Sequence, residues 1–126
     1  MRNIIAKSIL GKYNIYPTVV MSKTLDVKGM YLAEEDKIIL RDINEENPDP
    51  KDFVMTVLHE GKHAIDARRI GIRKFIKKYA QAGNVAVYCN RDYYSDNKWE
   101  IKAENWAVKE YEKTWRLNDI SEEDKK

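Results

Sequence analysis

The pattern in this sequence best suited to chemistry is His59-Glu60-Gly61-Lys62-His63, which combines two imidazoles with a carboxylate. Two histidines four residues apart on a helix lie one turn above the other, so both can reach a single zinc ion. Zinc lowers the pKa of a bound water to about 7, and a neighbouring carboxylate can then take its proton. Both histidines of the chain are in this pentapeptide. The pattern therefore predicts a hydrolytic zinc site with His59 and His63 as ligands and Glu60 as general base.

A hydrolytic zinc site needs a third protein ligand and leaves a fourth position for water. Because the chain has no third histidine, this ligand must be an Asp or a Glu. A later segment with helical periodicity offers Glu100 and Glu104, and small Ala103 and Ala107 would let it approach the histidine helix closely. The residues alone leave both glutamates as candidates.

The pentapeptide and the later glutamate together resemble the gluzincins, zinc metallopeptidases with HExxH on one helix and a glutamate on another. In several of these groups the second helix has the pattern E-x-x-A-x-x-x-A, which Glu100, Ala103 and Ala107 match. The resemblance covers roughly residues 27–110 and is closest to minimal single-domain gluzincins and to ImmA/IrrE-like and phage-associated peptidases. It implies Glu100 as the third zinc ligand, a zincin-like fold, endopeptidase activity and a peptide or protein substrate.

The sequence departs from this pattern on both helices. Glu104 stands where those families more often have Asp or Asn, and Lys62 replaces a small or apolar residue. We expect Lys62 to point to solvent. Asp66, three residues after His63, is expected either to accept the second N–H of a ligand histidine or to be solvated or paired with Arg69.

Stabilisation of an oxyanion would fall to a tyrosine, because no further histidine is available. Tyr88, Tyr93 and Tyr94 precede the glutamate segment, and we expect Tyr94 in this role, with Tyr93 as the alternative. The competing interpretation is that these tyrosines serve only in packing.

Hydrophobic spacing predicts the elements that must position these residues. Helices are expected over residues 2–13, 50–69, a basic segment from residue 72, and 96–115; a strand is expected over 18–21 and a hairpin over 27–33 and 37–41. Residues 44–50 and 81–95 are expected to be irregular. The prediction is an α+β fold, in which a small, mostly antiparallel sheet packs on the HExxH helix and a C-terminal glutamate helix. By the resemblance, the hairpin supplies an edge strand for extended substrate.

Length and composition indicate a single folded domain. The chain has 126 residues, of which 43% are hydrophobic and 35% charged, and we expect the domain to span 1–117 with a charged tail at 118–126. No apolar run has the ~18–20 residues of a membrane span, and no signal peptide is recognisable. The single Cys89 cannot form an internal disulfide. These features favour a reducing, cytoplasmic location, without a membrane partner.

A second function class comes from the basic residues between positions 68 and 78. Six Lys or Arg residues fall in this stretch, and on a helix four of them would share one outward face. Such a face is usually only solvated, but it could bind nucleic acid or an acidic protein. The alternative function is therefore a catalytically weak zincin-fold binding module that uses residues 68–78.

Overall fold

A computed structural model describes residues 2–42 and 49–116 of the chain. Most of the expected loop at 44–50 and the whole of the expected tail at 118–126 lie outside the described residues. The elements are α1 (Arg2–Gly11), β1 (Thr18–Ser22), β2 (Gly29–Leu32), η1 (Ala33–Glu35), β3 (Lys37–Arg41), α2 (Pro50–Ile70), α3 (Ile72–Tyr88), α4 (Lys98–Glu110) and η2 (Tyr111–Trp115). This confirms the α+β class. No helix in the described ranges is both long and apolar enough to cross a bilayer.

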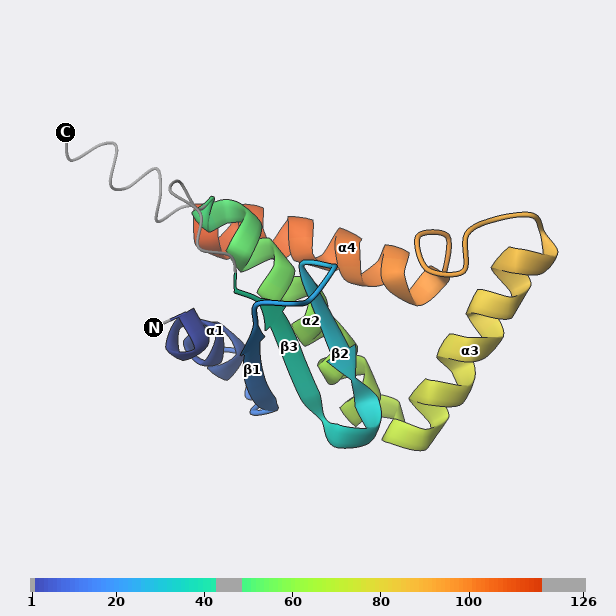
Figure 1. Cartoon of the computed structure of the whole chain (residues 1–126), viewed down its shortest axis with the longest axis horizontal. Coiled ribbons are helices and arrows are strands. Elements are labelled where there is room, and N and C mark those ends of the chain that lie inside the picture. The colour runs from blue at the N-terminus through green and yellow to red at the C-terminus, as the bar shows by residue number, and fades with distance from the viewer. Residues whose placement is uncertain (1, 43–48, 117–126) are drawn as a thin grey trace.

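The three strands form a mixed sheet in the order β1-β3-β2 (Figure 1). The expected hairpin is confirmed, with β2 antiparallel to β3 and Asp36 in the left-handed region (φ 48°) at the turn. The prediction of a mostly antiparallel sheet is wrong in one of the two pairings, because β1 runs parallel to β3. The chain reverses direction between β1 and β2 and again between β2 and β3. After two reversals, β3 runs in the same direction as β1. Because β3 lies between β1 and β2 in the sheet, it pairs with β1 in parallel.

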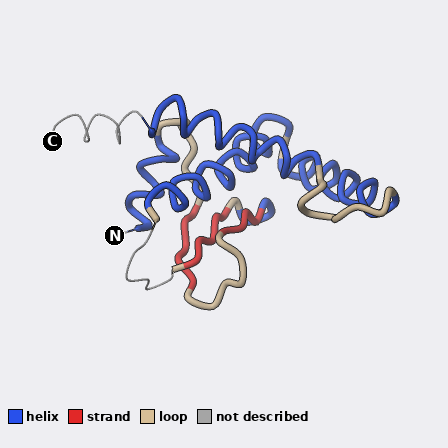
Figure 2. Tube along the Cα trace, turned by 90° about the horizontal axis from the view of Figure 1, so that it is seen from above, coloured by secondary structure: helices blue, strands red, loops and turns tan. Residues whose placement is uncertain are grey.

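The helices lie together on one side of the sheet (Figure 2). Ile38 and Leu40 point into this core from β3, where they meet a cluster that includes Leu58 of α2 and Leu10 of α1. The glycine of the HExxH pentapeptide is part of this packing. A Cβ at Gly61 would lie 2.7 Å from Leu10 Cδ2, which is too close for two carbon atoms. Gly61 therefore lets α1 pack directly against the predicted metal helix.

Local capping residues define both ends of α2. Pro50 lies in the first turn, and the Asp49 side chain caps the helix by accepting a hydrogen bond from the Lys51 backbone N–H at 3.0 Å. At the other end, Gly71 has φ 98° and donates its backbone N–H to the Ala67 carbonyl at 2.8 Å. α3 then starts at once, so the two helices are joined by a single residue.

α3 is longer than the sequence suggested. The expectation that residues 81–95 are irregular is wrong for 81–88, which continue the helix. Gly83 explains both why the helix was expected to end early and why it continues. Glycine weakens a helix when nothing replaces its side chain, but here the Tyr93 ring occupies that space, since a Cβ on Gly83 would lie 2.4 Å from Tyr93 Cε2. Packing of the following loop on α3 keeps this part of the chain helical.

Candidate metal centre

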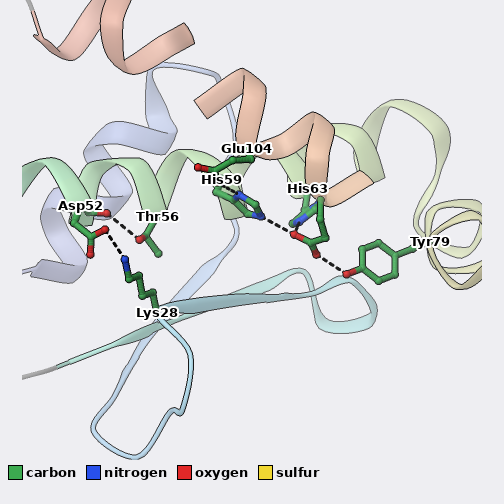
Figure 3. A network of polar contacts seen from close by, with 8 residues as sticks. Lys28, Asp52, Thr56, His59, His63, Tyr79 and Glu104 are labelled. Atoms are coloured by element: carbon green, nitrogen blue, oxygen red, sulfur yellow. Dashed lines mark hydrogen bonds and ion pairs between the residues drawn. The ribbon is translucent and has the colours of Figure 1, made fainter. Parts of the chain in front are cut away.

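The three residues predicted to bind metal meet between α2 and α4 (Figure 3). His59 Nε2 lies 2.6 Å and His63 Nε2 lies 3.0 Å from the same oxygen, Oε1 of Glu100. One ligand atom from each of the three residues can be chosen so that all lie within 4.8 Å of one another. The spacing of the two histidines on α2 and the approach of α4 thus create a group with the donor types of a metal site. The group could hold a metal ion, and the donors by themselves do not identify which.

Glu104 contacts the second nitrogen of one of these histidines. Its Oε2 lies 2.9 Å from His59 Nδ1, so this carboxylate accepts the Nδ1 proton, and the Nε2 lone pair becomes free for a metal ion once the proton that Nε2 shares with Glu100 is released. A carboxylate in this position orients a ligand imidazole. The two glutamates that the sequence left open therefore have different places, with Glu100 at Nε2 and Glu104 at Nδ1. His63 Nδ1 is buried and has no hydrogen-bond partner among the described residues.

Tyr79 of α3 is a residue of the site that the sequence analysis did not assign. Its hydroxyl donates a hydrogen bond to Glu100 Oε2, the carboxylate oxygen that faces away from the histidines (Figure 3). Its ring also lies 6.0 Å from that of His63, centroid to centroid. Tyr79 falls on the same stripe of α3 as Phe75 and Ile76, opposite the basic residues. That stripe was the available signal, because a polar hydroxyl on an inward face needs a partner.

Asn97 connects Tyr79 to the start of the glutamate helix. It is fully buried, and its side chain donates to the Tyr79 carbonyl at 3.0 Å and accepts from the Trp99 N–H at 2.9 Å. The second contact caps α4. One amide group therefore fixes α3 and the first turn of α4 together, three residues before Glu100.

Tyr94, the tyrosine predicted for oxyanion stabilisation, lies farther out. Its side chain is 64% exposed, and its ring packs on Tyr93, with the centroids 4.9 Å apart. Tyr93 in turn packs on Tyr79 at 6.4 Å. Within the described part of the chain, no hydrogen bond joins the Tyr94 side chain to the histidines or Glu100. The structure thus brings Tyr79, and not Tyr94, into hydrogen-bond contact with the site.

Glu60 lies buried beside this group, with 8% of its surface exposed. Burial raises the pKa of its carboxyl group, an effect that the two neighbouring histidines partly offset. The chain also makes room for it: a Cβ on Gly29 of β2 would lie 3.2 Å from Glu60 Cγ. Gly29 therefore allows the edge strand of the sheet to run close beside the predicted general base.

The charges of the site favour a cation. Burial opposes ionisation of both partners, but their hydrogen bond and charges prevail, so that the pKa of His59 is raised to about 9 and that of Glu100 is lowered. Three carboxylates, of Glu60, Glu100 and Glu104, surround two imidazoles. Protonation of His59 offsets part of this negative charge, and a divalent cation between the Nε2 atoms would do the same.

Lys62 within the motif and Asp66 after it differ in part from the expectations. Lys62 does not point to solvent: its side chain is 13% exposed, with Nζ 3.1 Å from Asp66 Oδ1. Asp66 makes no hydrogen bond to either histidine among the described contacts. It does approach Arg69, at 3.5 Å, as one of the expectations had it.

Cys89 is a free, exposed thiol.

The basic stretch divides between two helices. On α2, Arg68 pairs with Asp36 at 2.5 Å and Arg69 approaches Asp66. On α3, four cations are exposed and have no ion-pair partner in the described ranges: Arg73, Lys74, Lys77 and Lys78. The outward basic face expected from the sequence is therefore present on α3.

No family model, curated protein or solved structure matches this chain. What the candidate metal centre can do is therefore argued from its own geometry.

Proposed function

We propose that this protein is a zinc-dependent metallopeptidase of the gluzincin type. The proposal is supported above all by one observation: the two Nε2 atoms of an HExxH helix converge on Oε1 of a glutamate from a later helix, at 2.6 and 3.0 Å. Two imidazoles and one carboxylate are the protein ligands of a catalytic zinc site, whereas structural zinc sites close all four positions with protein groups.

The three ligands fit zinc in the type of their donor atoms as well as in their number. Imidazole nitrogen and a single carboxylate are ligands that zinc accepts, while magnesium and calcium prefer oxygen. His59, His63 and Glu100 would hold the ion, and Glu104 would orient His59. When bound, zinc supplies Lewis acidity toward a water molecule and the scissile carbonyl.

The proton transfers fall to Glu60. Its carboxylate takes a proton from the attacking water as the new C–O bond forms, and it delivers a proton to the amide nitrogen as the C–N bond breaks. A pKa raised by burial suits both steps, because the carboxylic acid formed in the first is then a better proton carrier near neutral pH. Strand β2 lies at the edge of the sheet beside Glu60, and its outer side pairs with no other strand of the described residues, so it could pair with an extended peptide.

Hydrolysis of an unstructured protein such as casein, by purified protein loaded with zinc, tests this function. We expect cleavage by the wild type, and a loss of about 10²–10⁴-fold in rate for Glu60→Gln. This variant keeps the shape of the side chain and should retain zinc. Glu35→Gln, which changes a glutamate of η1 outside the site, is the matched control and should cleave normally. Equal rates for wild type and Glu60→Gln would contradict the proposal.

A second candidate function, the zincin-fold binding module, is favoured by the four exposed and unpaired cations on α3. It predicts that Glu60→Gln leaves the relevant activity intact, whereas replacement of Lys74, Lys77 and Lys78 by Gln abolishes binding of double-stranded DNA at low salt. We rank it second, because a site that serves only structure has no need of a base next to the metal.

A further inference from the structure

The unusual lysine in the HExxH pentapeptide belongs to an ionic cluster between α2 and α4 that is centred on a buried carboxylate. Lys62 Nζ lies 3.1 Å and Lys102 Nζ lies 3.6 Å from the same oxygen, Oδ1 of Asp66. We call these three residues the Lys62–Asp66–Lys102 cluster. Asp66 has no exposed surface, whereas Lys62 is 13% and Lys102 46% exposed. A buried carboxylate is costly unless cations or donors compensate it, so the position of Asp66 depends on these lysines.

The cluster joins the two helices that carry the candidate metal ligands. Lys62 and Asp66 lie on α2, on either side of His63 in the chain. Lys102 lies on α4, midway in sequence between Glu100 and Glu104. Any movement of α4 along α2 that separates Lys102 from Asp66 therefore also displaces both glutamates from the histidines.

Tryptophans of α4 also contact the same two ammonium groups. Lys62 Nζ lies 5.7 Å from the centroid of the Trp106 ring, and Lys102 Nζ lies 5.2 Å from that of Trp99. Both distances are within the range of a cation–π contact. Lys62 is thus placed between Asp66 on its own helix and Trp106 on the other.

Part of the apolar contact between α2 and α4 is made by small side chains, beside the larger Trp99, which packs in one cluster with Ala67 of α2. The α4 residues on the same face as Glu100 are Ala103 and Ala107, both fully buried. Such small side chains permit close approach but present little relief to interlock with the opposite helix. Buried polar groups are known to set register where apolar packing alone does not.

We propose that Asp66 is a positioning residue, which through Lys62 and Lys102 holds α4 in the register that places Glu100 and Glu104 against the histidines. Its effect on metal affinity rests on the proposed function, whereas its effect on helix register does not. Asp66 itself touches no substrate and no ligand atom. It acts only through the placement of α4.

The test compares Asp66→Asn and Lys102→Met with wild type at a temperature where circular dichroism shows all three to be folded. Zinc affinity is measured by competition with a chromophoric chelator, and coordination geometry by the visible absorption of the cobalt(II) form. We expect both variants to bind zinc about 10–100-fold more weakly and to show an altered cobalt spectrum. Lys102→Arg, which keeps the positive charge, should stay close to wild type.

The matched control is Arg69→Met. Arg69 approaches the same oxygen at 3.5 Å but lies on α2 and is 56% exposed, so its loss leaves the link to α4 intact. Zinc affinity within about threefold of wild type is expected. If Asp66→Asn and Lys102→Met lower the melting temperature but leave zinc affinity and the cobalt spectrum unchanged, Asp66 only stabilises the fold and the positioning role is wrong.

A readout without metal separates this inference from the proposed function. The chain has two histidines, so their ring signals can be assigned in NMR spectra, and contacts between the His59 ring and the Glu104 side chain report the register directly. We expect these contacts in metal-free wild type and their loss in Lys102→Met. If wild type binds no zinc but shows this pattern, the metallopeptidase proposal fails and the positioning role stands. Retention of the contacts in Lys102→Met would overturn the positioning role.

Discussion

The hydroxyl of Tyr79 holds the oxygen of Glu100 that the histidines leave free. A Tyr79→Phe variant removes this hydrogen bond with little change of shape, so Glu100 loses one restraint on its orientation. We expect zinc affinity to fall about tenfold, as is typical when an outer partner of a metal ligand is removed, with an unchanged circular dichroism spectrum. Tyr94→Phe is the matched control, because the Tyr94 side chain is 64% exposed.

The same pair of variants decides which tyrosine serves the reaction. If Tyr94 stabilised the oxyanion, as the sequence analysis expected, Tyr94→Phe would lower kcat while leaving zinc affinity unchanged. From its contacts in the structure we expect Tyr94→Phe to retain both kcat and zinc affinity, whereas Tyr79→Phe binds zinc about tenfold more weakly. A lower kcat in Tyr94→Phe, with no change in Tyr79→Phe, would instead assign the functional role to Tyr94.

His59 makes the stability of the metal-free protein depend on pH. Burial alone would lower its pKa, but the hydrogen bond with Glu100 and the charges of Glu60 and Glu100 outweigh this and raise it from 6.5 to about 9. The folded state therefore binds this proton more tightly than the unfolded state. The resulting stabilisation is complete below pH 6.5 and is lost as the pH rises through about 9.

Urea unfolding in the presence of EDTA, between pH 6 and pH 9, measures this effect. We expect the free energy of unfolding of wild type to decrease over this range. His59→Gln should show a smaller decrease, and saturating zinc should abolish the contribution in wild type, because the metal takes the Nε2 lone pair. The same slope in wild type and His59→Gln would show that His59 does not hold the proton.

At the level of helices and strands, the sequence predicted an element correctly where residues close together in the chain determine it. Hydrophobic spacing predicted the helix at 50–69, and the structure has it at Pro50–Ile70, where Pro50 and Gly71 mark its ends. The β2–β3 hairpin was also predicted, because its turn is short and its strands adjacent in sequence. The pairing of β1 with β3 could not be predicted in this way, since it is set by contacts distant in the chain.

Long-range packing also explains what was missed in α3 and on α2. Gly83 looked like a break in the helix until the Tyr93 ring was seen to fill its place. Lys62 looked solvent-exposed on an isolated helix, and only the presence of α4 shows that it is covered. The metal ligands were easier to predict because the histidines are local in sequence. Tyr79 was missed because its partner lies 21 residues away.

Because Tyr93 packs on Gly83, we expect the effect of Gly83→Ala on stability to change sign when Tyr93 is removed. In Gly83→Ala the new Cβ would meet the Tyr93 ring at 2.4 Å, so overpacking should destabilise the protein by about 1–3 kcal/mol. In a Tyr93→Ala background the clash is absent. There the same substitution should stabilise the helix by about 0.5–1 kcal/mol.

Thermal unfolding of the four proteins, wild type, both single variants and the double variant, measures this coupling. A Gly83→Ala substitution that stabilises the wild-type background would show that the loop at 89–97 does not pack on α3. The result also bears on the site, since Tyr93 of this loop packs on Tyr79.

For the molecule as a whole, the fold assembles one site from three separate helices. α2 supplies the histidines and Glu60, α4 supplies Glu100 and Glu104, and α3 supplies Tyr79. Asn97 joins α3 to α4, and the Lys62–Asp66–Lys102 cluster joins α4 to α2. The three helices are thus tied to one another by polar contacts placed around the candidate metal centre.

Metal content decides whether this arrangement is a zinc site. Elemental analysis of wild type, His63→Ala and Glu100→Ala, after equilibration with zinc and removal of excess, should give about one zinc per chain in wild type. Zinc should be lost or much weakened in both variants, while Glu112→Ala, a control on the exposed end of the same C-terminal region, should retain it. If wild type takes up no zinc, or if both variants keep it, His59, His63 and Glu100 do not form a metal centre and the metallopeptidase proposal is wrong.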